Sequence, residues 1–388
     1  MEKNRVLTQR RTFLLGLGTL GCMGAVGMTH GIRLLNQNTQ VFDEESYLTA
    51  SGKVPLRDRS ATKGLLYGAA ASYRRLTTDR AFAARFAQEC NILVPEWELK
   101  WGTLRPSPDR FNFVPGDWLL KFARQHNMLF RGHTLVWHEA LPAWFAEKVD
   151  RHNAEQALKQ HITRVAGHFA GKIHSWDVVN EAILTQDGRS DGLRTSPWLQ
   201  FLGSNYIDIA FHTAAAADPQ ALLVYNETNL EYDTREDEAR RINTLKLLER
   251  LKSRGTPVHA LGVEGHLRGD ERRFNSRKFR AFLHDVASLG LKILITEMDV
   301  TDQKLPKDPK LRDRIVAEIY EDYLSVVLDE PAVIAVLTWG LSDRYTWLSK
   351  EKPRKDRAPV RPLPLDAQLN RKLAWNAIAR AFDNAPQR

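Results

Sequence analysis

The feature that most constrains the fold of this 388-residue chain is an alternation of short apolar runs with longer segments whose apolar residues recur at helical spacing. Eight runs have the length of buried β-strands: Leu65–Ala69, Ile92–Val94, Leu129–Val136, Ser175–Val179, Leu222–Tyr225, Leu261–Val263, Ile293–Thr296 and Val333–Thr338. Helical spacing marks the segments 79–90, 116–126, 153–170, 204–217, 235–254, 276–289 and 311–328. Strands that alternate with helices predict a parallel sheet covered by helices.

Eight strand–helix units are the number that closes a (β/α)8 TIM barrel. We therefore predict this α/β fold as a single domain over residues 60–388. A doubly wound open sheet is the alternative, since periodicity alone does not show that a sheet closes. Residues 31–59 are expected to be a polar lead-in with little core of their own.

The first 30 residues have the composition of a targeting segment. Arg10 and Arg11 precede Phe13 and Leu14, and an apolar, glycine-rich stretch then runs to Met28 without an acidic residue. This pattern predicts a signal peptide, and the paired arginines resemble a twin-arginine export signal. An ordinary secretory signal and a retained N-terminal membrane anchor are the alternatives. We expect an exported protein, periplasmic or extracellular.

The charge and the cysteine content exclude several classes of protein. The formal net charge of +9 raises the question of a nucleic-acid partner, but the basic residues are dispersed and form no basic helix or zinc finger. We therefore expect no nucleic-acid partner. The two cysteines, Cys22 and Cys90, are too few for a disulfide scaffold or for metal sites of the CxxC type.

Polar and aromatic residues collect where the predicted strands end. In a (β/α)8 barrel these carboxyl ends share one face, which is where such folds hold their active sites. The residues concerned are Arg131, His133, Trp137, His138, Asp177, Asn180, Glu181, Asn226, Glu227, Asn229, Glu264, His266, Glu297, Asp299, Trp339, Asp343 and Trp347.

Two of these residues, Glu181 and Glu297, directly follow apolar strands. A carboxylate in such a place costs desolvation free energy unless it has a partner or a chemical role. Glycoside hydrolysis requires two opposed carboxyl groups, one as acid and one as nucleophile or base. Tryptophans such as Trp137, Trp339 and Trp347 offer flat faces on which sugar rings stack. For any one of these residues alone, an ion pair or core packing is the alternative.

A metal-dependent barrel hydrolase is a further alternative, with His133 and His138 as ligands. The paired-histidine motif that such enzymes carry on their first strand is missing from this sequence. We therefore expect no metal and no organic cofactor.

Several segments together resemble the signature sequences of glycoside hydrolase family 10. These are RGHTLVWH at 131–138, DVVNE at 177–181 and ITEMDV at 295–300, with KW at 100–101, GKIHSWD at 171–177, GxxGH at 262–266 and WGLSD at 339–343. The resemblance covers residues 62–385 in the order and spacing of the family. It implies a (β/α)8 barrel and, most often, a retaining endo-β-1,4-xylanase.

The resemblance also implies a role for individual residues. Glu181 corresponds to the general acid/base and Glu297 to the nucleophile. Asn180 corresponds to the residue that binds the sugar 2-hydroxyl, while His266 contacts the nucleophile and Asp299 orients His266. Residues in substrate-binding positions are Glu96, Lys100, His133, Trp137, His138, Glu264, Trp339 and Trp347.

Three residues depart from the family pattern. Trp97 stands where Asn is usual and Glu264 where Gln is common, and Thr228 replaces an aromatic residue in the segment NETN at 226–229. We expect these changes to affect the choice of sugar more than the catalytic chemistry.

The sequence thus predicts a retaining endo-β-1,4-xylanase that acts on xylan as a monomer, without an obligate protein partner. The same mechanism on another β-glycan, such as a β-glucan, is the first alternative. A non-catalytic carbohydrate-binding barrel is the second, although both expected catalytic glutamates are present.

Overall fold

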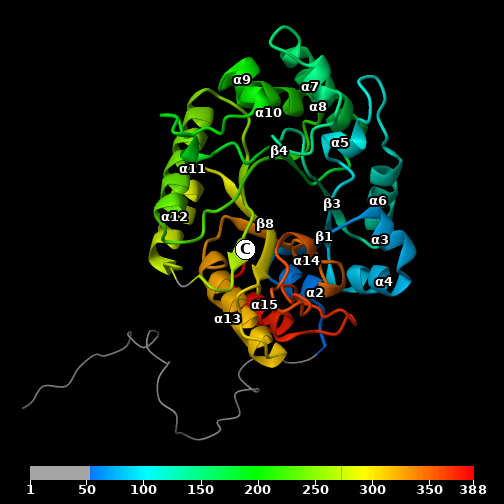
Figure 1. Cartoon of the computed structure of the whole chain (residues 1–388), viewed down its shortest axis with the longest axis vertical. Coiled ribbons are helices and arrows are strands. Elements are labelled where there is room, and N and C mark those ends of the chain that lie inside the picture. Colours follow the sequence, from blue (N-terminus) through cyan, green and yellow to red (C-terminus); the bar gives the residue numbers. More distant parts are fainter. Residues whose placement is uncertain (1–52, 272) are drawn as a thin grey trace, which may run out of the picture. The chain divides into compact units, whose positions relative to one another are not determined.

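The computed structural model describes residues 53–271 and 273–388, which all belong to one compact unit. Eight parallel strands of this part of the chain close into a barrel (Figure 1), because β1 pairs with β9 and β6 pairs with β8. They are β1 Leu66–Ala71, β2 Ile92–Pro95, β3 Leu129–Gly132, β4 Ser175–Asn180, β5 Leu222–Glu227, β6 Ala260–Val263, β8 Lys292–Thr301 and β9 Val333–Thr338. The closed ring confirms the predicted (β/α)8 barrel and excludes the open sheet.

Helices surround the strands, with α11 and α12 on one side of the barrel and α3, α4 and α6 on the opposite side (Figure 1). The longer helices are α4 Arg80–Glu89, α6 Val114–Gln125, α8 Ala154–His168, α10 Asn205–Ala217, α11 Arg235–Ser253, α12 Ser276–Ser288, α13 Pro309–Val327 and α15 Leu373–Asn384. The shorter elements are α2 Leu56–Ala61, α3 Tyr73–Thr78, α5 Trp101–Leu104, α7 Phe145–Lys148, α9 Pro197–Leu202, α14 Leu348–Glu351 and the 3₁₀ turns Thr185–Asp187 and Asp343–Tyr345. No described helix is long and apolar enough to span a membrane.

Two layers of apolar side chains hold the barrel together. The larger layer joins the strands to the surrounding helices. A second cluster consists mostly of strand residues that alternate with those of the first layer, as expected when successive side chains point to opposite faces. Its members are Ala70, Ile92, Val94, Val224, Ala260, Leu294, Ala335, Leu337 and Trp339. Trp347 packs against this cluster, so the barrel core continues into two of the predicted substrate-binding residues.

The third strand is shorter than the sequence predicts. The apolar run Leu129–Val136 predicts a strand through Val136, but β3 ends at Gly132, so the last part of this prediction is wrong. Beyond it, the Leu135 N–H donates to the carbonyl of Asp177 at 2.9 Å. Apolar content alone does not distinguish a strand from a loop buried between strands.

The first described helix belongs to the barrel domain. Leu56 of α2 is fully buried, and its N–H donates to the carboxylate of Glu89 on α4 at 3.1 Å. The predicted boundary at residue 60 therefore falls inside α2. The predicted signal segment, residues 1–30, lies outside the described residues.

Candidate active site

The two glutamates singled out from the sequence lie at the carboxyl ends of strands that are not neighbours in the barrel. Glu181 directly follows β4 and has a positive φ of 51°. Glu297 lies within β8, where the register with β9 shifts between Ile295 and Met298. Such an irregularity re-aims a side chain relative to a regular strand. Both residues therefore stand at the rim where barrel enzymes hold their active sites.

A chain of side-chain amides connects the two carboxyl groups. Asn180 Nδ2 donates to Glu181 Oε1 at 3.2 Å, and Asn180 Oδ1 accepts from Asn226 Nδ2 at 2.8 Å. The same Asn226 nitrogen lies 3.0 Å from Glu297 Oε1. Thr296 fixes the other end of the Asn226 amide, because its hydroxyl donates to Asn226 Oδ1 at 2.7 Å. The relative position of the two glutamates is thus set by buried and partly buried hydrogen bonds.

Glycine 262 makes room for this amide chain. A Cβ atom at Gly262 on β6 would lie 2.1 Å from Asn226 Oδ1. Real Cβ atoms do not approach an oxygen so closely, so the Asn226 side chain requires a glycine here. The glycine of the 262–266 motif therefore serves the site geometry directly.

Glu297 is held as a carboxylate by the groups around it. Burial raises the pKa of Glu297, but the charge interactions with His133 and His266 and a hydrogen bond from His266 outweigh burial and lower it to about 2. His133 Nδ1 lies 3.8 Å from Glu297 Oε1, and His266 Nε2 lies 3.4 Å from Glu297 Oε2. A permanently ionised, positioned carboxylate is suited to nucleophilic attack.

His266 owes its charge to a second carboxylate behind it. Burial lowers the pKa of His266, but Asp299 and Glu297 raise it well above the ordinary histidine value. His266 Nδ1 lies 3.0 Å from Asp299 Oδ1, and Asp299 Oδ2 accepts from Trp347 Nε1 at 2.7 Å. The structure therefore brings the predicted supporting residues together in one chain that ends on Glu297.

Glu181 has the opposite character. Burial and the negative charges of Glu227 and Glu297 raise the pKa of Glu181 to about 7, although Arg194 acts in the other direction. Arg194 Nη2 lies 3.5 Å from Glu181 Oε2, and Arg194 Nε donates to the Glu181 carbonyl at 2.8 Å. Glu181 thus has an arginine partner, as a purely structural glutamate would. Arg194 does not, however, offset the rise in the pKa of Glu181 that burial causes. Glu181 can hold a proton near neutral pH.

An aromatic cage surrounds a buried lysine beside the carboxyl groups. The ammonium of Lys100 lies 4.6, 4.8 and 5.5 Å from the ring centroids of Trp97, Trp137 and Trp339, respectively. Burial lowers the pKa of Lys100, and Glu297 and Glu96 partly counteract this effect. The cage combines stacking faces with a hydrogen-bond donor, which is a typical arrangement for binding a sugar.

The remaining predicted substrate-binding residues lie on the same rim. His133 is buried; its Nδ1 lies 2.9 Å from Asp177 Oδ2, and its ring centroid is 5.2 Å from that of Trp339. Burial, followed by the charge of Arg194, lowers the pKa of His138 to about 4. Glu96 pairs with Arg75.

Several contributors were not assigned a role from the sequence. Asn226 was noted at a strand end, but its position as the shared donor depends on residues from three other strands. Arg194 lies in the loop after β4, outside every recognised motif. Glu227 is fully buried, pairs with Arg240 at 3.0 Å and raises the pKa of Glu181. The sequence signal for Glu227 is its place two residues after the predicted apolar strand Leu222–Tyr225.

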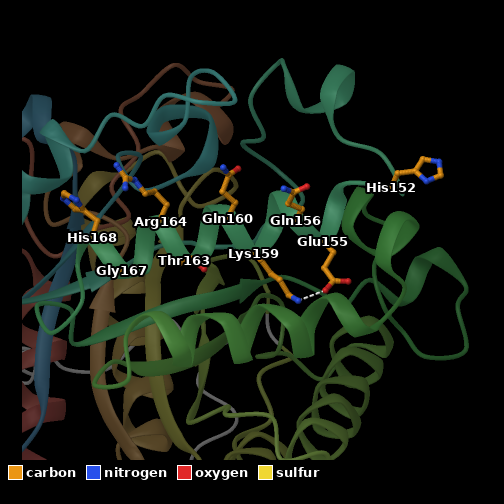
Figure 2. Close-up of a pocket in the computed structure, with 9 residues that line it drawn as sticks. All are labelled: His152, Glu155, Gln156, Lys159, Gln160, Thr163, Arg164, Gly167 and His168. Atoms are coloured by element: carbon orange, nitrogen blue, oxygen red, sulfur yellow. Dashed lines mark hydrogen bonds and ion pairs between the residues drawn. The ribbon is translucent and has the colours of Figure 1, made fainter.

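A broad hollow elsewhere on the surface contains none of this chemistry. It runs along the outer face of α8 and is lined by polar side chains (Figure 2). Between the residues that line it, Lys159 and Glu155 form an ion pair at 2.6 Å, and both side chains are half exposed. No strand-end residue contributes to the lining, so we place the active site at the barrel rim.

One group of acidic and histidine side chains among the described residues has the proximity of a metal site. Glu264, His266 and Glu297 bring three potential ligand atoms within 4.8 Å of one another. Both nitrogens of His266 already face carboxylates, Asp299 on one side and Glu297 on the other. We therefore assign the group to the control of charge and protons.

Comparison with known proteins agrees with this geometry. The family model described as "Glycosyl hydrolase family 10" matches residues 55–381. The chain belongs to glycosyl hydrolase family 10. It is 34% identical over 338 residues to endo-1,4-beta-xylanase B of Thermotoga neapolitana, covering 86% of this chain and 93% of the relative. It is 35% identical over 326 residues to exoglucanase XynX of Acetivibrio thermocellus, covering 80% of this chain and 28% of the relative.

Solved structures of family 10 enzymes share the barrel. The structure of xylanase 10B from Thermotoga petrophila RKU-1 in complex with xylobiose matches with a TM-score of 0.77 and 32% identity, over 86% of this chain and 98% of that one. Of the three departures from the family pattern, Trp97 is 50% exposed beside Lys100. Glu264, in contrast, is buried between the catalytic positions.

Proposed function

We propose that this family 10 protein is a retaining endo-1,4-β-xylanase. The observation that carries the proposal is the opposite acidity of two carboxyl groups on one rim, Glu181 with a pKa of about 7 and Glu297 with a pKa of about 2. Retaining glycosidases need this division, because one carboxyl group must deliver a proton while the other attacks as an anion.

In the first step, a carboxylate oxygen of Glu297 forms a bond to the anomeric carbon and the glycosidic bond breaks. Glu181 gives its proton to the departing oxygen. In the second step, Glu181 removes a proton from a water molecule, whose oxygen attacks the anomeric carbon and displaces Glu297. Two inversions give net retention, and this path expects carboxyl groups about 5–5.5 Å apart.

The charge coupling between the two residues assists the change in the role of Glu181. The negative charge of Glu297 contributes to the raised pKa of Glu181. When Glu297 becomes an ester in the glycosyl-enzyme, this charge is lost and the pKa of Glu181 falls. Glu181 therefore holds its proton before the glycosidic bond breaks, and it is ionised and ready to act as a base once the glycosyl-enzyme has formed.

The comparisons point to xylan as the substrate, since matched proteins are named xylanases and one matched structure contains xylobiose. Activity on a β-glucan is the second candidate. It is supported by the similarity to an exoglucanase and by Trp97, an exposed member of the lysine cage that departs from the family pattern. The cage of Lys100 and its tryptophans binds sugar rings in either case.

The decisive experiment measures reducing-end release from xylan, mixed-linkage β-glucan and carboxymethyl cellulose, with Glu297→Ala as the inactive control. We expect xylan cleavage by the wild-type chain and a loss of at least about 10³-fold in the variant, because alanine removes the oxygen that attacks the anomeric carbon. Cleavage of glucan alone would move the specificity and keep the mechanism. Full activity of Glu297→Ala would overturn the nucleophile assignment.

We further propose that the enzyme is exported through the twin-arginine route and acts as a monomer in the periplasm or outside the cell. The support for export is the sequence pattern of Arg10, Arg11 and the following apolar stretch, and the expectation of a monomer rests on the resemblance to the family. A reporter fused to residues 1–30 should be exported. The same reporter with the double substitution Arg10→Lys and Arg11→Lys should remain in the cytoplasm. Unchanged export of the double variant would instead favour an ordinary secretory signal.

A further inference from the structure

A third carboxyl group, that of Glu264, is buried between the two catalytic positions. Glu264 follows β6 and is 3% exposed. Its backbone is fixed on both sides, because its N–H donates to the Glu227 carbonyl at 3.0 Å and its carbonyl accepts from the Glu297 N–H at 2.9 Å. The Glu264 backbone is therefore held directly against the strand that carries Glu297.

The site offers Glu264 too few hydrogen-bond donors for an ionised carboxylate. Asn226 Nδ2 carries two hydrogens, yet it faces three acceptors, at 2.8 Å on Asn180, 3.0 Å on Glu297 and 3.3 Å on Glu264. Glu264 is the most distant of the three. Among the described residues, the hydroxyl of Thr228 is a second hydrogen-bond donor to Glu264. An ionised carboxylate has about four lone-pair sites to satisfy, whereas a neutral acid needs fewer donors and supplies one itself.

The nearest cationic side chain, His266, lies closer to the nucleophile than to Glu264. His266 Nε2 lies 3.4 Å from Glu297 Oε2 but 3.8 Å from Glu264 Oε2. The charged groups that face Glu264 are Glu181 after β4, Glu297 on β8, His266 at the start of the short strand β7 (His266–Arg268) and Lys100 before α5.

The charges around Glu264 act in the same direction as the geometry. Burial, followed by the negative charges of Glu297 and Glu181, raises the pKa of Glu264 well above its ordinary value, and His266 offsets only part of this effect.

We propose that Glu264 is a positioning residue that stays a neutral carboxylic acid in the working enzyme and fixes Asn226 and the nucleophile as a side-chain amide would. The carbonyl oxygen of Glu264 accepts a hydrogen bond from Asn226. Its hydroxyl adds one hydrogen-bond donor to the cluster with His266 and Glu297, in which one atom of each side chain lies within 4.8 Å of the others. Glu297 then remains the ionised member of the pair. This inference deepens the proposed function and rests on it.

The test compares the pH dependence of kcat/KM for wild type, Glu264→Gln and Glu264→Ala. If Glu264 is neutral, glutamine replaces it without a change of charge, so Glu264→Gln should leave both pH limbs of kcat/KM at the wild-type pH. Glu264→Ala should lose at least about tenfold, because Asn226 and the cluster lose a partner. If Glu264 is ionised, Glu264→Gln removes a negative charge and shifts both limbs to lower pH, which would overturn the proposal.

A second readout does not depend on activity. In chains labelled with ¹³C at the glutamate carboxyl carbon, NMR at pH 6 should show a neutral-acid resonance that is absent from Glu264→Gln. Glu264→Asp removes the same resonance. The assignment can therefore be made with either variant, even if the other one does not fold. A Glu264 resonance at the carboxylate position would overturn the proposal even if wild type cleaved no glycan. Absent glycanase activity with a neutral Glu264 would overturn only the proposed function.

Discussion

Glu181 and Glu297 are the same type of residue, and their surroundings give them opposite acidities. Burial and neighbouring negative charges raise the pKa of Glu181. The pKa of Glu297 is lowered, because two histidines outweigh the effect of burial. Activity therefore requires Glu181 with its proton and Glu297 without one. It should fall as the pH rises through about 7, where Glu181 ionises, and at the acid side only as the pH approaches 2, where Glu297 becomes neutral.

The Asp299→Asn variant tests the acid limb of this profile. Asp299 raises the pKa of His266, whose charge lowers the pKa of Glu297. With asparagine, His266 loses its proton more readily and the pKa of Glu297 rises, so the acid limb of kcat/KM should move to higher pH by about one unit. The alkaline limb should stay in place, because Asp299 is not among the main causes of the Glu181 shift. An unchanged acid limb would show that His266 holds its charge without Asp299.

Among the elements, the strands were predictable because a barrel buries both faces of each strand, which leaves a continuous apolar run in the sequence. The predicted and observed strands agree closely, except that β3 stops at Gly132 and that β8, predicted as Ile293–Thr296, continues to Thr301. The short strand β7, His266–Arg268, was not predicted. It contains the histidine and a basic residue and has no apolar run that periodicity could detect. The eighth outer helix, α15, is expected from the eight strand–helix units, but helical spacing in the sequence does not locate it.

The candidate site was predictable only where its residues lie in contiguous motifs. Asn180 and Glu181 share one segment, and Glu297 and Asp299 share another, so their spacing is visible in the chain. The Asn226 junction has no such signal, because its partners come from separate strands and meet only after the barrel closes. Periodicity carries no information about which polar side chains will face one another across a barrel.

A close approach between β3 and β4 gives a prediction for a single element. A Cβ atom at Gly132 would lie 2.1 Å from the ring of Trp176, which is fully buried. Gly132→Ala should therefore destabilise the protein by about 1–3 kcal/mol through overpacking. The matched control is Gly167→Ala in α8, where a Cβ meets no atom within 4 Å and stability should rise by about 0.5–1 kcal/mol. Urea unfolding of both variants measures the difference. Equal stability of the two would contradict the predicted crowding.

At the scale of the whole molecule, one buried carboxylate ties the first described helix to the last. Glu89 on α4 is fully buried and accepts from the Leu56 N–H of α2 at 3.1 Å and from Trp375 Nε1 of α15 at 3.0 Å. Arg371 Nε, just before α15, donates to it at 2.9 Å. The helices on either side of the junction between β1 and β9, where the barrel closes in sequence, thus share one acceptor.

Removal of that acceptor should weaken the closure of the barrel more than the loss of any exposed ion pair. Glu89→Ala leaves the buried donors of Leu56 and Trp375 and the charge of Arg371 without this partner, so we expect a loss of about 3–5 kcal/mol in the free energy of unfolding. Glu155→Ala, which removes an exposed pair with Lys159 on α8, is the matched control and should change it by less than about 1 kcal/mol. Urea unfolding compares the two. Similar unfolding midpoints would mean that packing of α2 and α15, without the shared carboxylate, closes the barrel.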